Sequence, residues 1–255
     1  MALAVVTGAS SGIGSQFARQ LSHRGYDLVL VARNKEKLTN VADKCRTRCE
    51  IVIADLSKEA ECKKLLKYLE SKSVDLFINN AGFGNIGLFE ENDLDRDIQM
   101  IDTNVRAVHI LTHGILKQMK RVDKGYILNT ASLAGLMPGG PLMATYYATK
   151  AYVVSMTNGI DQELKYTGSN VKISALCPGP VDTEFNDIAG VKFSLGGISA
   201  RKCVINCLKD MKKGKVIIIP SLLHSIAAVL GRVLPMSFVM SFVLKAQRKK
   251  IEGDE

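Results

Sequence analysis

The 255-residue chain contains no tryptophan, and aromatic residues make up only 6% of it. Proline is also scarce, with six residues, and no Gly/Ser-rich linker, internal repeat or low-complexity tract interrupts the sequence. The rest of the composition, 47% apolar and 23% charged, is typical of a globular protein that buries a full core. Without a linker to separate two units, one domain is the simpler interpretation.

The N-terminus lacks the features of a secretory signal. Met1–Val6 is apolar but runs directly into a glycine-rich turn, with no charged region before it and no cleavage site. We therefore expect the protein in the cytosol, where cysteines stay reduced. Among the six cysteines, Cys45 and Cys49, and likewise Cys203 and Cys207, have a spacing suited to one helix face. No histidine lies near either pair in the sequence, so we expect structural thiols and no metal site.

An excess of basic residues late in the chain contributes to the formal net charge of +9. Two groups carry much of it: Arg201, Lys202, Lys209, Lys212, Lys213 and Lys215, followed by Lys245, Arg248, Lys249 and Lys250. These stretches hold few aromatic residues and no recognised nucleic-acid-binding motif, so no nucleic-acid partner is expected. A solvated basic face is the preferred interpretation, and attraction to anionic substrates or to a membrane surface is the alternative.

Strand and helix patterns alternate along most of the chain. Short apolar runs predict buried strands at residues 2–7, 27–31, 50–54, 74–79, 125–131, 171–177 and 215–219. Helical spacing predicts helices at residues 13–24, 34–48, 58–72, 93–121 (in two pieces), 146–166 and 198–212. Strands that are apolar throughout belong to parallel sheets covered by helices on both faces. The predicted fold is therefore α/β, a single-domain Rossmann-type doubly wound parallel sheet of about seven strands.

The last part of the chain differs from this alternation. We assign residues 1–220 to the Rossmann-fold domain and residues 221–255 to a C-terminal helical extension, or lid, of the same domain. Ser221–Leu244 is apolar, but Arg232 near its middle and Pro235 argue against a membrane span. We expect two short helices that cover a substrate cleft or contact another subunit. The less favoured alternative is a helix on a membrane surface, since apolar residues are followed by lysines.

A glycine-rich turn, Thr7–Gly14, joins the first predicted strand to the first predicted helix. Glycines allow a tight turn and let a pyrophosphate approach the backbone amides, and the helix N-terminus adds unpaired N–H groups. The spacing Gly-x3-Gly-x-Gly differs from the more common Gly-x-Gly-x2-Gly, but the position between strand and helix favours a dinucleotide over a plain turn. The expected contacts are Gly8, Ser10, Ser11, Gly12, Ile13 and Gly14.

The end of the second predicted strand indicates which dinucleotide is bound. An NAD-binding protein usually has an acidic residue there, which binds the ribose 2′-hydroxyl. Here the sequence reads Ala32-Arg33-Asn34-Lys35, without a carboxylate. The Arg33 guanidinium suits a bidentate contact with a 2′-phosphate. We therefore expect NADP(H), with NAD(H) less favoured; the alternative is that Arg33 only begins a solvated helix.

Tyr146 and Lys150 lie four residues apart at the start of a predicted helix, so their side chains share one helix face. A tyrosine hydroxyl has an ordinary pKa of about 10, and a nearby ammonium lowers that pKa toward the range useful for general acid–base catalysis. Ser132 follows the fifth predicted strand, at the edge of the sheet where parallel α/β folds place their ligand crevice. Its hydroxyl is suited to hold a substrate oxygen next to Tyr146.

These residues occur with further motifs in an order that resembles the classical short-chain dehydrogenase/reductase family. The matching segments, between residues 7 and 183, are Thr7–Gly14, Asp55-Leu56, Asn79-Asn80-Ala81-Gly82, Asn104, Ser132, Tyr146-x3-Lys150 and Pro178-Gly179. Joint agreement at these spacings is far more specific than any one motif.

The resemblance implies a role for each matching residue. Tyr146 would donate a proton to a carbonyl during reduction or remove one from an alcohol, and Ser132 would orient the substrate oxygen. Lys150 would lower the pKa of Tyr146 and hold the nicotinamide ribose, and Asn104 would hold a water that links Lys150 to solvent. Further cofactor contacts would come from Asp55, Leu56, Asn80, Ala81, Gly82, Pro178, Gly179, Val181 and Thr183. Two structural alternatives stay open: Asn80 ties strands together, and Asp55 caps a turn.

The substrate would be contacted by residues 83–84, 133–143 and 185–197. The segment Leu136–Met143 is apolar, and its methionines suit an adaptable surface. This favours a hydrophobic carbonyl or alcohol, such as a steroid, fatty acyl or aromatic ketone, over a sugar. The predicted protein is an NADP(H)-dependent oxidoreductase of hydroxysteroid or 3-oxoacyl type, active as a homodimer or homotetramer. The alternative is a non-catalytic NADP(H)-binding scaffold or sensor on the same fold.

Overall fold

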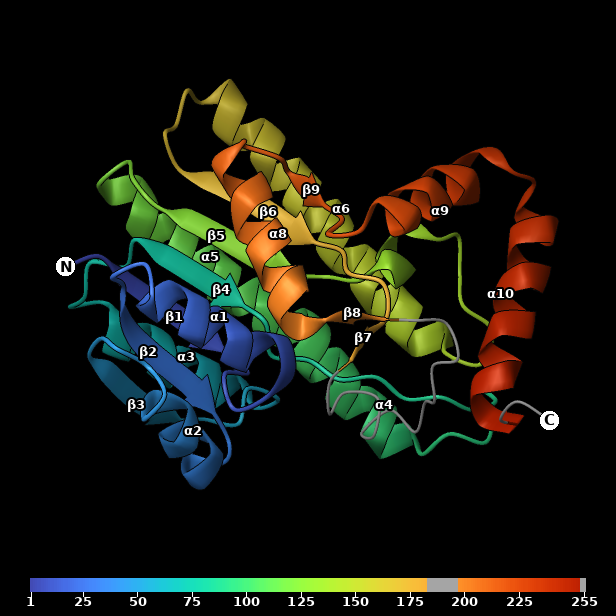
Figure 1. Ribbon diagram of the computed structural model, residues 1–255, viewed down its shortest axis with the longest axis horizontal. Coiled ribbons are helices and arrows are strands. Elements are labelled where there is room, and N and C mark those ends of the chain that lie inside the picture. Colours follow the sequence, from blue (N-terminus) through green and yellow to red (C-terminus); the bar gives the residue numbers. More distant parts are fainter. Residues whose placement is uncertain (183–196, 253–255) are drawn as a thin grey trace.

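The computed structural model describes residues 1–182 and 197–252 of the chain (Figure 1). Within these ranges, seven parallel strands form one sheet in the order β3-β2-β1-β4-β5-β6-β9. The strands are β1 (Leu3–Thr7), β2 (Asp27–Ala32), β3 (Cys49–Ile53), β4 (Leu76–Asn79), β5 (Tyr126–Thr130), β6 (Lys172–Leu176) and β9 (Ile217–Ile218). This order is that of a doubly wound Rossmann-type sheet, and the predicted fold class is confirmed.

Helices cover both faces of the sheet (Figure 1). On one face a hydrophobic cluster joins the strands to α1 (Gly12–Ser22), α2 (Lys35–Ala42) and α8 (Ala200–Lys212). On the other face a second cluster joins them to α3 (Glu59–Leu69), α5 (Val108–Arg121) and α6 (Ala144–Tyr166). Because side chains alternate along a strand, Val5 packs in the second cluster and Val6 in the first. This double covering explains why the strands are apolar throughout.

Shorter elements lie at the carboxyl ends of the strands. The predicted helix at 93–121 consists of three pieces rather than two, because a π-helical turn joins α4 to α5. A second, two-stranded sheet follows β6, and a single 3-10 turn precedes α6. These elements are α4 (Leu94–Ile101), the π-helix η1 (Asp102–Ala107), the 3-10 helix η2 (Leu133–Leu136), β7 (Val181–Asp182) and β8 (Ile198–Ser199).

The predicted helix at 34–48 is wrong in its second half, because α2 ends at Ala42. The Ser22 hydroxyl accepts hydrogen bonds from the backbone amides of Arg46 and Thr47 and so holds this segment in a turn. Cys45 therefore lies outside the helix and does not share a helix face with a partner four residues on. All six cysteines are free, and the described residues contain no group of three or more His, Cys, Asp or Glu placed to hold a metal ion.

The C-terminal extension forms two helices, α9 (Leu222–Val233) and α10 (Met236–Glu252), with Pro235 between them. They stand beside the carboxyl edge of the sheet, away from the N-terminus of the chain (Figure 1). Many of their apolar side chains are exposed, including Leu222 and Phe242 at 80% and 68%. Within the ranges that the structure describes, no helix has both the length and the apolar character needed to cross a membrane.

Candidate active site

A cavity of about 1280 Å³ runs along the carboxyl ends of the parallel strands. Its lining begins at the turn after β1, continues past the ends of β2 to β6, and finishes at α9 and α10. Open α/β sheets bind their ligands at this edge. Pockets for one small molecule commonly measure roughly 300–1,000 Å³, so this cavity has room for a large cofactor together with a substrate.

The glycine-rich turn has the geometry that a pyrophosphate requires. Gly8 and Gly12 adopt positive φ angles of +63° and +51°, which glycine adopts without strain. Ser11, at the N-cap of α1, makes no side-chain hydrogen bond to the first turn of the helix. The cap side chain thus leaves the first amides of α1 available, and Ser11, Gly12 and Ile13 line the cavity, where an anion would find N–H donors and the helix dipole. The turn therefore fits the diphosphate of a dinucleotide.

Of the residues predicted in this turn, one has a different place. The cavity is lined by Gly8, Ser10, Ser11, Gly12 and Ile13, whereas Gly14 packs behind them. A Cβ atom on Gly14 would lie 2.1 Å from the carbonyl oxygen of Gly8, closer than any real contact. Gly14 thus lets α1 approach the turn and does not itself reach the cavity.

The far end of the cavity is lined by residues that follow β2 and β3. After β2 these are Arg33, with an exposed side chain, and then Asn34 and Lys37. The Asn34 side chain caps α2 by accepting a hydrogen bond of 2.9 Å from the Lys37 amide. After β3, Asp55 lines the cavity and accepts hydrogen bonds from the Ser57 amide and hydroxyl. The turn-capping alternative for Asp55 is therefore present in the structure, next to its place in the lining.

Asn80 also has the structural role that the sequence left open. Its Nδ2 donates to the carbonyl oxygen of Thr7 at 3.2 Å, and its Oδ1 accepts from the Thr130 hydroxyl at 3.3 Å. These bonds tie the ends of β1, β4 and β5 together, and the Thr7 hydroxyl adds bonds from the amides of Asn80 and Ala81. Asn80, Ala81 and Gly82 line the middle of the cavity at this junction.

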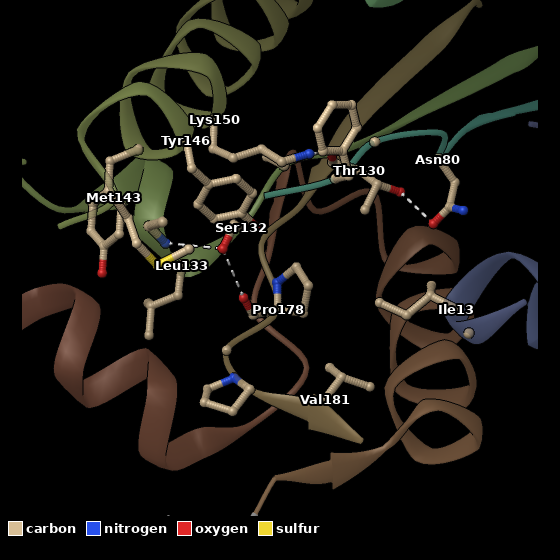
Figure 2. Close-up of a pocket in the computed structure, with 18 of the residues that line it drawn as sticks. Ile13, Asn80, Thr130, Ser132, Leu133, Met143, Tyr146, Lys150, Pro178 and Val181 are labelled. Atoms are coloured by element: carbon tan, nitrogen blue, oxygen red, sulfur yellow. Dashed lines mark hydrogen bonds between the residues drawn. The ribbon is translucent and has the colours of Figure 1, made fainter. Parts of the chain in front are cut away.

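Tyr146, Lys150 and Ser132 line the cavity together, and all three are buried. In Figure 2 the Tyr146 ring lies beside Ser132, and the Lys150 side chain extends toward Thr130. The Ser132 hydroxyl accepts a hydrogen bond of 3.1 Å from the Ala134 amide. It is also hydrogen-bonded to the side chain of Tyr146. The Lys150 Nζ donates a 3.0 Å hydrogen bond to the carbonyl oxygen of Thr130. The helix α6 and the end of β5 thus bring together residues up to 20 positions apart in the sequence.

Burial dominates the electrostatics of this cluster. Burial raises the pKa of Tyr146 to about 12, and the hydrogen bond with Ser132 offsets only part of this rise. Burial lowers the pKa of Lys150 to about 8. The Nζ atom of Lys150 lies 5.8 Å from the centre of the Tyr146 ring. Burial is the main influence on the Tyr146 pKa here, and the expectation that Lys150 lowers that pKa stays a prediction. At neutral pH Tyr146 keeps its proton.

Asn104 lies in the π-helix η1 and is fully buried. Its Nδ2 donates to the carbonyl oxygen of Phe83 at 2.8 Å and to the Thr149 hydroxyl at 3.2 Å, and its Oδ1 accepts from the Phe83 amide at 3.1 Å. A Cβ on Gly82 would lie 2.8 Å from this Oδ1. Asn104 therefore supports the cavity wall from behind; π-helical turns inside helices are frequent at such sites.

The remaining predicted residues follow β3 and β6. Leu56, Pro178, Gly179 and Val181 line the cavity, and Thr183 falls outside the described residues. The predicted substrate segment at 83–84 contributes Phe83, and the segment at 133–143 contributes Leu133, Ala134, Met137 and Met143. Residues 185–196 of the third segment are also outside the described residues.

Several lining residues were missed by the sequence analysis. Thr130 acts through its backbone carbonyl, for which side-chain chemistry gives no signal, although its position two residues before Ser132 points to the same strand end. Tyr147 was passed over because only Tyr146 has the correct spacing to Lys150. Gln247 and the apolar residues of α9 and α10 come from a segment that matches no motif: Ala227, Leu230, Gly231, Leu234, Phe238, Val239, Phe242 and Val243.

A model of the family described as short chain dehydrogenase matches residues 2–190. The chain belongs to this family. The chain is therefore an oxidoreductase with a fold that binds a nicotinamide cofactor. This agrees with the resemblance seen in the sequence. The match spans the glycine-rich turn, Ser132, Tyr146 and Lys150.

Known relatives agree with this assignment. An uncharacterized oxidoreductase of Staphylococcus saprophyticus is 37% identical over 188 residues, which cover 72% of this chain and 75% of the relative. A short-chain dehydrogenase from Sphingobium yanoikuyae, solved in complex with NADPH, superposes with a TM-score of 0.80 at 27% identity and covers 93% of this chain and 98% of its own. A short-chain dehydrogenase/reductase from Burkholderia phymatum, solved with NAD, has a TM-score of 0.81 at 27% identity, with 90% and 92% covered.

Proposed function

We propose that this short-chain dehydrogenase prefers NADP(H) and interconverts a hydrophobic carbonyl compound and its secondary alcohol, of hydroxysteroid or 3-oxoacyl type. The observation that carries the proposal is the position of Tyr146. Its side chain is buried against Ser132 and Lys150 at the point where the dinucleotide half of the cavity meets an apolar half. A carbonyl oxygen that reaches Tyr146 is next to both halves.

Reduction adds a hydride to the carbonyl carbon and a proton to its oxygen. When bound, the reduced nicotinamide supplies the hydride, and in the reverse direction its oxidised form accepts one. Tyr146 is the proton donor in this proposal, because its raised pKa keeps the hydroxyl protonated at neutral pH. Ser132 offers a second hydroxyl to the same carbonyl oxygen, so the oxygen is polarised and oriented before the proton moves.

Lys150 stabilises the phenolate that remains after Tyr146 gives up its proton. With its pKa lowered to about 8, Lys150 is largely charged at neutral pH. After reduction its ammonium group is able to give a proton to the Tyr146 phenolate, which restores the hydroxyl and leaves a neutral amine. We also propose that Lys150 contacts the nicotinamide ribose. A water held near Asn104 would pass protons between Lys150 and solvent. Asn104 itself is a positioning residue, since it bonds Phe83 and Thr149.

The preference for NADP(H) is supported by the junction of β2 and α2. The residues of this junction that line the cavity are Ala32, Arg33, Asn34 and Lys37, and none of them is acidic. Arg33 is exposed at the cavity rim, where its planar guanidinium suits a ribose 2′-phosphate. NAD(H) is the less favoured cofactor in this proposal because no carboxylate among these residues is placed to bind a free 2′-hydroxyl.

The preference for a hydrophobic substrate is supported by the lining beyond Tyr146. There the wall is formed by Met137, Met143, Phe238, Phe242 and Val243. We propose that residues 221–255 are a lid over this part of the cavity and belong to the same domain as residues 1–220. The proposal also includes a homodimer or homotetramer in the cytosol, with a small-molecule substrate and no nucleic-acid partner.

The test is a substrate screen that follows NADPH oxidation and identifies the products. Steroid ketones, 3-oxoacyl thioesters and aromatic ketones form the test panel, and reducing sugars of similar carbonyl reactivity form the control. We expect alcohol formation from at least one hydrophobic class, and faster turnover with NADPH than with NADH. Tight NADPH binding without turnover of any compound would instead favour the non-catalytic scaffold.

A further inference from the structure

The side chain of Gln247 has an unusual environment. It comes from α10, lines the cavity, and is only 2% exposed. Its Nε2 donates a hydrogen bond of 2.8 Å to the Tyr147 hydroxyl. Its Oε1 is buried and has no hydrogen-bond partner among the described residues. The amide group is therefore half satisfied.

A buried polar atom without a partner costs roughly 1–3 kcal/mol, so native structures nearly always supply one. On α10 the cavity lining near Gln247 consists of the apolar residues Phe242, Val243 and Ala246 and of Lys245. The Lys245 side chain is exposed, and Oε1 of Gln247 has no hydrogen-bond partner among the described residues. A buried acceptor thus lies in a stretch of wall whose buried side chains are mostly apolar. A donor group on a bound substrate would complete the hydrogen bonding of Oε1.

The Gln247 amide is held at its Nε2 end by the Tyr147 hydroxyl. The Tyr147 ring is held in place by Gly140, where a Cβ atom would lie 2.2 Å from a ring carbon. The ring also makes an edge-on contact with Tyr146, with ring centres 6.3 Å apart. Because the Tyr147 hydroxyl engages Nε2, the Oε1 end of the amide is the one left for a ligand. Tyr147 and Gln247 form what we call the polar anchor.

We propose that the polar anchor binds a hydroxyl group of the substrate, separate from the carbonyl that reacts at Tyr146. The inference rests on the proposed function and narrows its substrate class to hydrophobic hydroxy-ketones and the matching diols. Oε1 accepts a hydrogen bond from the substrate hydroxyl. An ether oxygen at the same position carries no hydrogen and forms no such bond. A carboxylate oxygen at that position only accepts hydrogen bonds, as Oε1 does, so the two atoms would form no hydrogen bond with each other.

The experiment uses three ketones with one carbon skeleton, which carry a distal hydroxyl, a methyl ether or a hydrogen. Their affinities for the protein saturated with NADPH are measured by calorimetry, and their reduction is followed in parallel. We expect the hydroxy-ketone to bind about tenfold more tightly than the other two, the ratio that one added hydrogen bond of about 1.4 kcal/mol provides.

Two variants and a control locate the effect. Gln247→Met keeps the length of the side chain and removes the amide, so the affinity ratio between hydroxy-ketone and hydrogen analogue should fall close to one. Tyr147→Phe frees Nε2 and should lower the same ratio in part. Tyr152→Phe is the control, because Tyr152 lies on the same helix but bonds His109 on the exterior, and its ratio should equal that of the wild type.

The outcomes separate the anchor from the proposed function. Absence of turnover with every ketone overturns the proposed function, while the calorimetric affinities still decide the anchor. Equal affinity for the hydroxy-ketone and the methyl ether, or an unchanged ratio in Gln247→Met, overturns the anchor alone. A lower melting temperature in Gln247→Met, with equal weakening for all three ketones, would mean that Gln247 only holds α10 against α6, and would also overturn it.

Discussion

The Nζ atom of Lys150 donates a 3.0 Å hydrogen bond to the backbone carbonyl oxygen of Thr130, at the end of β5. This bond joins the helix that carries Tyr146 to the strand end that precedes Ser132. A buried ammonium is normally paired with a carboxylate, but burial is the main influence on the Lys150 pKa, which it lowers to about 8. The Lys150 amine, hydrogen-bonded to Thr130, therefore gains and loses its proton at a pH near neutrality.

The lowered pKa of Lys150 predicts how stability changes with pH. Between about pH 8 and 10.5 the unfolded chain binds a proton at this position and the folded protein does not, so folding becomes more favourable as pH rises. The free energy of unfolding, relative to Lys150→Met, should increase by up to about 3 kcal/mol across this window. Urea unfolding of both proteins at pH 8 and pH 10, without added nucleotide, measures it. A difference that is flat or falls with pH would contradict the lowering of the Lys150 pKa by burial.

Arg33 provides a test of cofactor preference. Arg33→Ala removes a charge-assisted contact with the 2′-phosphate, worth roughly 1.5–3 kcal/mol, so the KM for NADPH should rise about tenfold to a hundredfold. The KM for NADH should stay unchanged, because that cofactor carries no 2′-phosphate. Lys35→Ala is the matched control, since Lys35 is a neighbouring exposed base that does not line the cavity. If Arg33→Ala leaves the KM for NADPH unchanged, Arg33 does not select the cofactor.

Gly14 and Gly159 are both helical glycines but have opposite surroundings. In Gly14→Ala the new Cβ meets the carbonyl oxygen of Gly8 at 2.1 Å, so the turn must move. We expect a stability loss of about 1–3 kcal/mol and at least tenfold weaker NADPH binding. In Gly159→Ala the Cβ meets nothing within 4 Å, and the better helix propensity should add about 1 kcal/mol of stability. Thermal unfolding and nucleotide titration of both variants test this contrast, and similar effects in the two would refute it.

A buried polar network supports the sheet beneath the site. The fully buried Asn129 accepts a hydrogen bond from the Thr112 hydroxyl at 3.1 Å and donates one to the Thr157 hydroxyl at 3.1 Å. Asn129→Ala should lower the free energy of unfolding by about 2–4 kcal/mol, because both the packing and the hydrogen-bond partners are lost. Thr39→Ala on the exposed face of α2 is the control and should stay within about 0.5 kcal/mol of the wild type. Equal effects in the two variants would show that the network carries no stability.

Much of the fold could be predicted because its causes are local. Strands buried on both faces are apolar throughout, so β1 and β2 are visible in the sequence, and the glycines of the turn between β1 and α1 indicate its backbone shape. The predicted helix at 34–48 failed in its second half because a distant residue, Ser22, binds the amides that a longer helix would use. A local pattern contains no information about that contact.

The positions of the main residues of the candidate site could also be predicted from the sequence. Spacing placed Tyr146 and Lys150 on one helix face, and their strand-end partner Ser132 followed from topology. The direction of the Tyr146 pKa shift could not be predicted, because it depends on how far the ring is buried and not on which residue lies four positions away. Gln247 could not be predicted either, because it meets Tyr147 across 100 positions and belongs to no motif.

The measurement that tests the central claim most directly is the turnover of Tyr146→Phe, which removes only the hydroxyl. With the best carbonyl substrate of the screen, kcat should fall by about 10²–10⁴-fold, the usual contribution of a general acid, while the dissociation constant for NADPH stays within about threefold. Tyr147→Phe, assayed with a substrate that lacks a distal hydroxyl, shows how much a neighbouring tyrosine contributes. A kcat for Tyr146→Phe within about twofold of the wild type would contradict Tyr146 as the proton donor.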